Sequence, residues 1–322
     1  MSTRILLWFL ILIIFSACRK SNYAEPVVPV IPDSLYQWKE IGQIPDSYAD
    51  DIFFTSPASG YMVGNQIFQT RDSGRTWTAV PGSSVTTGLF NLFFTDSNYG
   101  FAEGSSQMAF TTDGGSTWKI KPLRSPGAFT LFFVNSAVGF YGDNTGGGLY
   151  KTTDGGNNWT SVFNVPSVPD NFYPYFLNQD TGFVATNSGV FAGTTDGGLT
   201  WNTKNNITNP SSSGTYNQLQ FLNAKDGYYG CHVGVMKTTN GGQTWNNILP
   251  GETGNNVNVI KFFDTQSGYY KGSTTIYHTT DAGQTWTISC RIGSGFFIGM
   301  NFLDAHTGWV CTAKGRVFRI QD

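Results

Sequence analysis

The octet "TTDGGNNW", residues 152–159, combines a threonine, an Asp-Gly turn and a tryptophan. Asp and Gly favour tight turns, because Asp accepts hydrogen bonds from nearby backbone N–H groups and Gly readily adopts positive φ. A tryptophan that follows such a turn has a large apolar surface with which to fasten the hairpin to its sheet. We therefore interpret the octet as the turn of a β-hairpin, held down by its tryptophan.

Five close copies of the octet recur along the chain. They are "TRDSGRTW" (70–77), "TTDGGSTW" (111–118), "TTDGGLTW" (194–201), "TTNGGQTW" (238–245) and "TTDAGQTW" (279–286), and successive tryptophans lie 41 to 44 residues apart. A second signal, Gly followed by an aromatic residue, occurs seven times, at Gly60-Tyr61, Gly100-Phe101, Gly139-Phe140, Gly182-Phe183, Gly227-Tyr228, Gly268-Tyr269 and Gly308-Trp309. A period near 41 residues that holds about four short strands is typical of a β-propeller blade.

The composition agrees with this interpretation. Charged residues make up only 12% of the chain and aromatic residues 16%, with 39 glycines, which indicates many short strands and tight turns rather than long helices. The net charge of -2 and the absence of a Lys/Arg run exclude a surface for nucleic acid. We predict an all-β protein, in which residues 36–322 form a single seven-bladed β-propeller of four-stranded antiparallel blades.

The two ends of this region are predicted to close the ring. "GRVFRIQD" (315–322) matches a third strand and the start of an octet, but no fourth strand follows it. "YQWKEI" (36–41) looks like an isolated fourth strand, because Trp38 precedes Trp77 by about one repeat. We expect this N-terminal strand to complete blade seven, which removes the open sheet edges that an unclosed ring would leave.

The first 35 residues are expected to lie outside the fold. Residues 1–17 contain Arg4 and the apolar run "ILLWFLILIIF", which is typical of a signal peptide and short for a permanent membrane span. Phe15-Ser16-Ala17-Cys18 resembles the lipobox of bacterial lipoproteins, which predicts lipidation at Cys18; a plain secretory signal is the alternative. Residues 18–35, with "EPVVPVIP", read as a Pro-rich tether. We expect an outer-membrane lipoprotein that faces the periplasm or the cell surface.

The six octets resemble the Asp-box, or bacterial neuraminidase repeat, which implies a place at the hairpin between the third and fourth strands of a blade. The residues at the Asp position are Asp72, Asp113, Asp154, Asp196, Asn240 and Asp281. Asn240 indicates a structural role, because accepting turn hydrogen bonds requires no charge. Calcium binding is disfavoured, because each box offers one carboxylate at most and calcium prefers six to eight oxygen ligands.

The face opposite the boxes is the expected place for function. It should carry the long connections between blades, which differ from one another, and variable loops on a rigid scaffold are where binding residues concentrate. We expect these loops to bind a protein, a peptide or a glycan. The candidate binding residues are Tyr48, Asp50, Arg124, Asp170, Tyr173, Tyr216, Glu252, Arg291, Phe296 and Phe297.

The first strand of each blade should line the central channel. In blades five to seven these strands depart from the apolar pattern at Gln218, Gln220, Lys261 and Asn301. A water-filled channel and a small-ligand site both explain such residues.

No set of catalytic or metal-binding residues stands out. Sialidases also contain Asp-boxes but require an arginine triad, a Tyr-Glu pair and an acid Asp, and "FRI" at 318–320 is a poor match to their arginine motif. A glycosidase needs two facing carboxyl groups. Xyloglucanase-like enzymes place these groups between two propellers, whereas this sequence predicts a single propeller. His232, His278 and His306 occupy different repeat positions, so we expect no metal and no cofactor. Cys290 and Cys311 could be bridged.

A seven-bladed Asp-box propeller behind a lipoprotein signal resembles the photosystem II stability and assembly factor family. The six boxes and seven Gly-aromatic pairs carry this resemblance. It implies a non-enzymatic scaffold that holds partner polypeptides in the cell envelope, and we expect a monomer; a glycan-binding or glycoside-hydrolysing propeller is the alternative. Family members often carry an arginine-rich patch, whereas these loops hold only Arg124 and Arg291, so we expect a role outside photosynthesis.

Overall fold

The computed structural model describes most of the chain from residue 38 onward. The described residues are 38–45, 48–85, 88–123, 128–143, 148–165, 170–204, 206–207, 217–249, 257 and 259–320. The predicted signal peptide, Cys18 and the tether lie outside them. Nowhere in these ranges is there a helix with the length and hydropathy that a membrane crossing requires.

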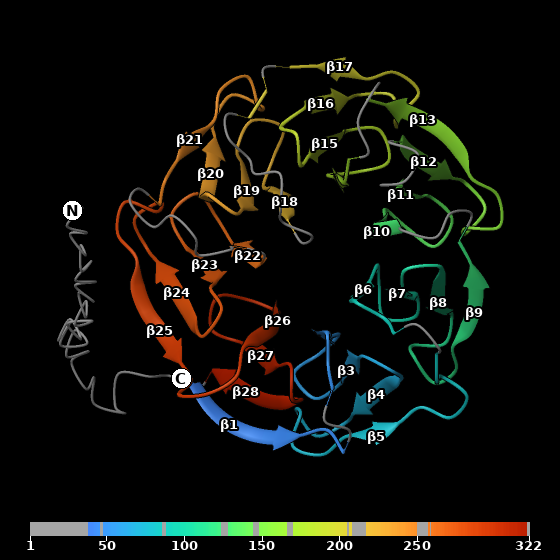
Figure 1. Cartoon of the computed structure of the whole chain (residues 1–322), viewed down its shortest axis with the longest axis vertical. Helices are drawn as coiled ribbons and strands as arrows, with labels where there is room; N and C mark the ends of the chain where they lie inside the picture. Colours follow the sequence, from blue (N-terminus) through green and yellow to red (C-terminus); the bar gives the residue numbers. More distant parts are fainter. Residues whose placement is uncertain are drawn as a thin grey trace, which may run out of the picture. The chain divides into compact units, whose positions relative to one another are not determined.

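Seven four-stranded antiparallel sheets are arranged around a central axis, as the sequence predicts (Figure 1). The strands of blades one to four are β2 (Asp51–Phe54), β3 (Gly60–Val63), β4 (Ile67–Thr70) and β5 (Thr78–Ala79); β6 (Asn91–Phe94), β7 (Gly100–Glu103), β8 (Gln107–Thr111) and β9 (Lys119–Pro122); β10 (Ala128–Phe133), β11 (Gly139–Asp143), β12 (Gly148–Thr152) and β13 (Thr160–Asn164); and β14 (Phe172–Phe176), β15 (Gly182–Thr186), β16 (Phe191–Thr194) and β17 (Asn202–Thr203). Those of blades five to seven are β18 (Gln218–Phe221), β19 (Gly227–Cys231), β20 (Gly234–Thr238) and β21 (Asn246–Asn247); β22 (Val259–Phe262), β23 (Gly268–Lys271), β24 (Thr275–Thr279) and β25 (Thr287–Arg291); and β26 (Phe297–Phe302), β27 (Gly308–Thr312), β28 (Arg316–Ile320) and β1 (Trp38–Gln43).

Strand β1 closes the ring. It pairs antiparallel with β28, with Trp38 opposite Ile320 and Glu40 opposite Phe318, so the first and last strands of the propeller share one sheet. The Glu40 carboxylate accepts hydrogen bonds from the Arg316 guanidinium, at 2.5 and 2.9 Å. The predicted closure by the Trp38 segment is therefore confirmed.

One phenylalanine at the end of the first strand of every blade joins neighbouring blades. In blade three, the ring of Phe133 stacks at 3.8 Å on Phe101 of blade two and meets the box tryptophan Trp159 edge-on at 6.1 Å. The same two contacts occur in all seven blades. In blade seven, Trp38 takes the place of a box tryptophan against Phe302. The Gly-aromatic pairs and the boxes thus supply the contacts between blades and within each blade.

The glycine of each Gly-aromatic pair is required by this packing. A Cβ atom on Gly182 would lie 2.3 Å from the ring of Phe176, and the six equivalent glycines would clash in the same way. The phenylalanine ring lies flat over the glycine, which leaves no room for a side chain.

The box aspartates form closed hydrogen-bond sets inside their own turns. In the box of blade six, Asp281 accepts hydrogen bonds from the Thr279 hydroxyl, the Thr285 backbone N–H and the Thr285 hydroxyl, at 2.6 to 2.9 Å. Asn240 keeps the same contacts with its amide: it accepts from the Thr244 N–H and donates to the Thr244 hydroxyl. The hydrogen bonds from Thr285 lower the pKa of Asp281 to about 2. The carboxylate thus forms its hydrogen bonds within its own turn.

Exchanging Asp281 for asparagine should therefore be tolerated, and exchanging it for alanine should not. We expect Asp281→Asn to lower the urea midpoint at pH 7 only slightly, because the amide oxygen still accepts the turn hydrogen bonds although it lacks the charge of the carboxylate. Asp281→Ala should lower the midpoint, because several turn donors lose their acceptor. Equal losses in both variants would show that the charge itself matters.

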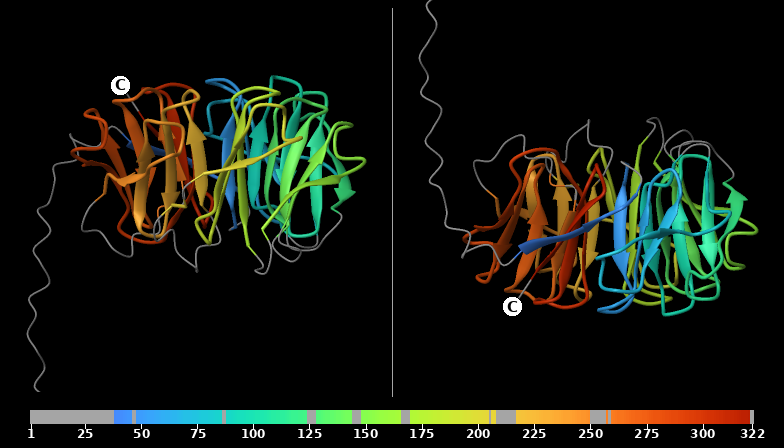
Figure 2. Two further views of the ribbon diagram at one scale, coloured as in Figure 1. Left: turned by 90° about the horizontal axis from the view of Figure 1, so that it is seen from above. Right: turned by 90° about the horizontal axis from the view of Figure 1, so that it is seen from below.

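The antiparallel order within each blade defines two faces of the propeller (Figure 2). The box turns and the turns between first and second strands lie on one face, which we call the box face. The connections between blades and the turns between second and third strands lie on the other, which we call the loop face. Of the candidate binding residues within the described ranges, Tyr48, Asp50, Asp170 and Phe296 lie in these connections, and Tyr173, Arg291 and Phe297 lie at the adjoining ends of β14, β25 and β26.

Candidate functional site

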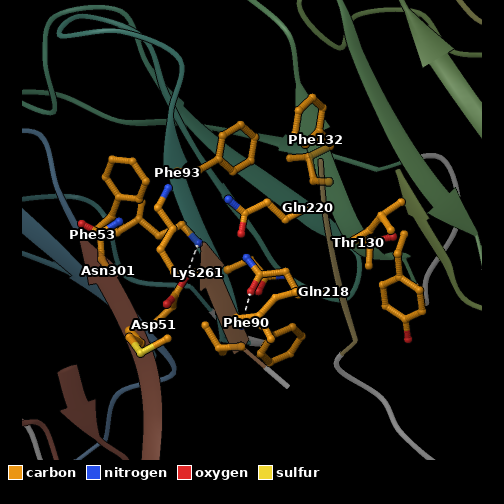
Figure 3. Close-up of a pocket in the computed structure, with 18 of the residues that line it drawn as sticks. Asp51, Phe53, Phe90, Phe93, Thr130, Phe132, Gln218, Gln220, Lys261 and Asn301 are labelled. Atoms are coloured by element: carbon orange, nitrogen blue, oxygen red, sulfur yellow. Dashed lines mark hydrogen bonds between the residues drawn. The ribbon is translucent and has the colours of Figure 1, made fainter. Parts of the chain in front are cut away.

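A cavity of about 470 Å³ lies on the propeller axis, where the first strands of the seven blades meet. All four predicted channel residues, Gln218, Gln220, Lys261 and Asn301, line it. Figure 3 shows the rings of Phe93 and Phe132 above the side chains of Gln220 and Gln218, with Phe53 and Asn301 at the left and Lys261 between the two groups. The cavity therefore combines an aromatic wall with a polar one.

This division follows the sequence of the blades. One residue of each first strand stands opposite the aromatic residue of the Gly-aromatic pair, as Phe53 stands opposite Tyr61 in blade one. From blade one to blade seven these residues are Phe53, Phe93, Phe132, Tyr175, Gln220, Lys261 and Asn301. Blades one to four thus contribute aromatic side chains and blades five to seven polar ones. The polar members were predicted from the sequence; the four aromatic ones were not, although their shared register could have marked them.

Most polar groups of this wall form hydrogen bonds with the backbone of a neighbouring blade. The Gln220 amide accepts from the Phe262 N–H at 2.9 Å and donates to the Phe262 carbonyl at 2.7 Å. The oxygen of Gln218 accepts from the Ile260 N–H at 2.8 Å, and that of Asn301 accepts from the Phe54 N–H at 3.0 Å. These amides therefore link blade five to blade six and blade seven to blade one.

Two carboxyl groups that were not among the predicted site residues, the buried Glu103 and the half-buried Asp51, also link neighbouring blades. Asp51 accepts from the Leu92 N–H at 2.9 Å, and Glu103 accepts from the Leu131 N–H at 2.8 Å, which links blades one, two and three. Burial raises the pKa of each to about 7. The second oxygen of Glu103 is buried without a hydrogen-bond partner, which favours the protonated form further. Both groups act as hydrogen-bonded structural carboxyls.

The raised pKa of Glu103 predicts a loss of stability at high pH. The pKa is higher in the folded than in the unfolded chain, so the stabilisation is complete below about pH 4.5 and is lost as pH rises through about 7. The parent protein should lose stability of order 2 kcal/mol from this group between pH 5 and pH 8. Glu103→Gln, which cannot ionise, should show a smaller slope in urea unfolding over this range; an unchanged slope would contradict the assignment.

Three candidate residues of the loop face, Tyr48, Arg291 and Phe296, are exposed, and a fourth, Asp50, is half-buried. Phe296 is 62% exposed and Tyr48 40% exposed, and each belongs to a connection that borders blade seven. The Tyr48 hydroxyl donates to Asp50 at 2.9 Å. Burial raises the pKa of Asp50 to about 6, and one of its oxygens has no hydrogen-bond partner. Arg291 is exposed at the end of β25.

The other candidates of the loop face are buried or not described. Asp170 accepts hydrogen bonds from the backbone and hydroxyl of Ser188, and the Tyr173 hydroxyl donates to Asn187 at 2.9 Å. Phe297 is only 2% exposed and packs against Phe318. The expectation that these three residues face a partner is corrected, because each is used inside the scaffold. Arg124, Tyr216 and Glu252 lie outside the described residues.

The cysteine and histidine residues show no reactive arrangement in the described ranges. Cys231, Cys290 and Cys311 are free and buried, so the bridge considered between the last two is absent. His278 stacks on Tyr269 at 4.4 Å. Within these ranges no group of three or more His, Cys, Asp or Glu residues is placed to hold a metal ion.

The sequence is similar to the photosystem II assembly factors. The family described as photosynthesis system II assembly factor YCF48 matches residues 174–295. The photosystem II assembly lipoprotein Ycf48 of Synechococcus sp. (strain CC9902) is 32% identical over 138 residues, which is 40% of this chain and 40% of that relative. The chain aligns with about half, or less, of the length of the curated relatives it matches.

The fold is shared with binding proteins and with enzymes. A solved structure of YCF48 bound to D1 peptide has a TM-score of 0.68 and 20% identity, and the alignment covers 89% of this chain and 95% of that one. Virginiamycin B lyase from Staphylococcus aureus has a TM-score of 0.71 and 13% identity, over 88% and 98%. The chain is thus an Asp-box seven-bladed propeller resembling the photosystem II assembly factors, and the fold by itself does not decide between binding and catalysis.

Proposed function

We propose that this protein is a non-enzymatic scaffold, exported and held at the outer membrane by a lipid on Cys18, that binds a protein or peptide on its loop face. The observation that carries the proposal is the pair of exposed aromatic side chains on that face, Tyr48 and Phe296. Large aromatic residues that protrude from a rigid surface are favourable anchors for a polypeptide partner.

Backbone hydrogen bonds hold the two segments that carry these side chains against one turn. Ala313, in the turn between β27 and β28, donates its N–H to the Phe296 carbonyl at 3.0 Å and accepts from the Ala49 N–H at 3.1 Å. Tyr48 and Phe296 therefore flank one turn, next to the exposed Lys314. We call Tyr48, Phe296 and Lys314 the blade-seven patch. Because its backbone is already ordered, a partner would bind with little loss of conformational freedom.

Hydrolysis of a glycan is less well supported by the described residues. A glycosidase needs an acid and a base or nucleophile that face the same bond. Asp50 and Asp51 are neighbouring carboxyls at the cavity, but the two oxygens of Asp51 accept hydrogen bonds from the Ile52 and Leu92 N–H groups. The similarity to an assembly lipoprotein, and to a propeller solved with a bound peptide, supports binding instead.

Photo-crosslinking tests which face meets the partner. A benzoylphenylalanine in place of Phe296 should crosslink to a defined protein of the cell envelope, identified by mass spectrometry. The matched control carries the same group at Leu199, which is 77% exposed on the box face. Crosslinking from position 199 but not 296, or from neither position, would contradict the proposal.

Membrane attachment has its own test. Cys18→Ser removes the thiol that would receive the acyl chains, so the variant should leave the membrane fraction and be recovered as a freely exported protein. Acyl chains anchor by burying methylene groups, at about 0.8 kcal/mol each. An unchanged distribution between membrane and soluble fractions, together with failure of the parent chain to incorporate labelled palmitate, would count against lipidation.

A further inference from the structure

The polar wall of the central cavity presents free donors, because its acceptors are used by the scaffold. The amide oxygens of Gln218 and Asn301 accept from the backbone of the next blade, whereas no hydrogen bond is formed by either amide NH₂ group with the described residues. The Lys261 ammonium forms no hydrogen bond or ion pair with any described residue, and lies 6.0 Å from the centre of the Phe263 ring. A group that fits this wall accepts hydrogen bonds and carries negative charge.

Lys261 is expected to lower the stability of the folded state. It is half-buried, and burial lowers the pKa of its ammonium group. An ammonium group taken out of water without a partner destabilises the folded state. The equivalent positions in blades five and seven hold neutral amides that form links between blades, so the geometry of the ring does not require a charge here. Departures of this kind from the pattern of the fold are expected at functional sites.

The opposite wall selects an apolar body. Phe93 and Phe132 lie with ring centres 6.5 Å apart, and Phe132 and Tyr175 5.6 Å apart, so the rings form a continuous surface. All three are accessible from the cavity. A volume of about 470 Å³ falls within the range of small-molecule sites.

The charges along the axis orient such a ligand. Asp50 and Asp51 line the cavity at the start of the first strand, toward the loop face. Lys261 lies two residues further along its strand than the position equivalent to Asp51, which places it about 7 Å deeper in the cavity. A second lysine of the cavity, Lys271, is buried and donates to the Phe297 carbonyl at 3.2 Å. The pKa of Asp50 is about 6, so at pH 7 this group is largely ionised; it repels an anionic group from the loop-face end of the cavity, whereas Lys261 attracts it.

We propose that the central cavity binds a small carboxylate with an aromatic or hydrocarbon body, its carboxylate on Lys261 and its body against Phe93, Phe132 and Tyr175. This site is separate from the blade-seven patch and does not depend on a protein partner.

The test uses 4-phenylbutyrate, its neutral amide and 4-phenylbutylamine as probes in calorimetry and saturation-transfer NMR. The acid should bind one site, and the amide should bind ten- to a hundredfold more weakly, because a hydrogen-bonded charge is replaced by a neutral group. The amine should bind more weakly still. Equal affinities for acid and amide, or no saturable binding of the acid, would overturn the proposal.

Two lysine variants locate the carboxylate. Lys261→Met keeps most of the chain length and removes the charge, so it should reduce the affinity for the acid to that for the amide. Lys119→Met, which removes one exposed charge on the outer strand β9, should leave it unchanged. Lys261→Met should also raise the melting temperature, since it removes a half-buried charge that no hydrogen bond or ion pair with a described residue compensates. A lower melting temperature of Lys261→Met would show that Lys261 stabilises the fold. Unchanged binding of the acid to this variant would show that Lys261 does not bind the carboxylate.

Discussion

Replacing Trp309 with alanine is expected to lower the free energy of unfolding by about 3 to 5 kcal/mol. Trp309 is fully buried, and its ring stacks on Phe54 of blade one at 3.7 Å, while its indole N–H donates to the Ser73 carbonyl at 2.9 Å. Alanine would leave a cavity and an unpaired carbonyl where blade seven meets blade one. Since the whole stability of a domain is commonly 5 to 15 kcal/mol, this loss is a large share.

Urea unfolding followed by near-UV circular dichroism measures the effect. The control is Leu199→Ala, which shortens a side chain that is 77% exposed and should change the free energy of unfolding by about 0.5 kcal/mol or less. A comparably small change in Trp309→Ala would show that the contact between blades seven and one contributes little to the ring.

Removing strand β1 should have the largest effect of all on the fold. A chain that begins at Ile44 lacks the fourth strand of blade seven and leaves the backbone edge of β28 unpaired. It also loses Trp38, which packs edge-on against Phe302 at 5.7 Å and donates its indole N–H to Ser289 of blade six. Open sheet edges recruit other chains, so we expect this chain to self-associate and to lose its cooperative unfolding transition.

The matched control begins at Ser34 and keeps β1. It should be monomeric in size-exclusion chromatography and should unfold in one cooperative transition. Monomeric, cooperative behaviour in the chain that begins at Ile44 would mean that the ring is held without its closing strand, contrary to the pairing of Trp38 with Ile320.

The repeat made the architecture predictable. A glycine that cannot carry a Cβ under a phenylalanine ring, and a tryptophan beside the same ring, recur in every blade, so local sequence and global packing agree. For the same reason the closing strand could be found: Trp38 occupies the position of a box tryptophan. The face of the propeller on which each turn lies could then be predicted from the alternating direction of the strands.

The individual site residues were less predictable, because a one-residue shift along a strand reverses the direction of a side chain. Phe296 is exposed just before β26, whereas the adjacent Phe297 begins the strand and is buried. Asp51 and Glu103 depend on N–H groups of another blade, 41 and 28 residues away in sequence, so no local pattern marks them. Lys261 is recognisable from the sequence because it interrupts a position that is aromatic in the first four blades.

The equilibrium affinity of the purified partner for two double variants tests the proposed function most directly. Tyr48→Ser with Phe296→Ser alters the loop face, and Ile120→Ser with Leu199→Ser alters exposed apolar residues on the outer strand β9 and the box face. The account predicts at least a tenfold weaker affinity for the first variant and an unchanged affinity for the second, with both proteins unfolding like the parent, because interface anchors typically contribute more than 1 kcal/mol each. Unchanged affinity in the first variant, or a loss in the second alone, would contradict the assignment of the partner to the loop face.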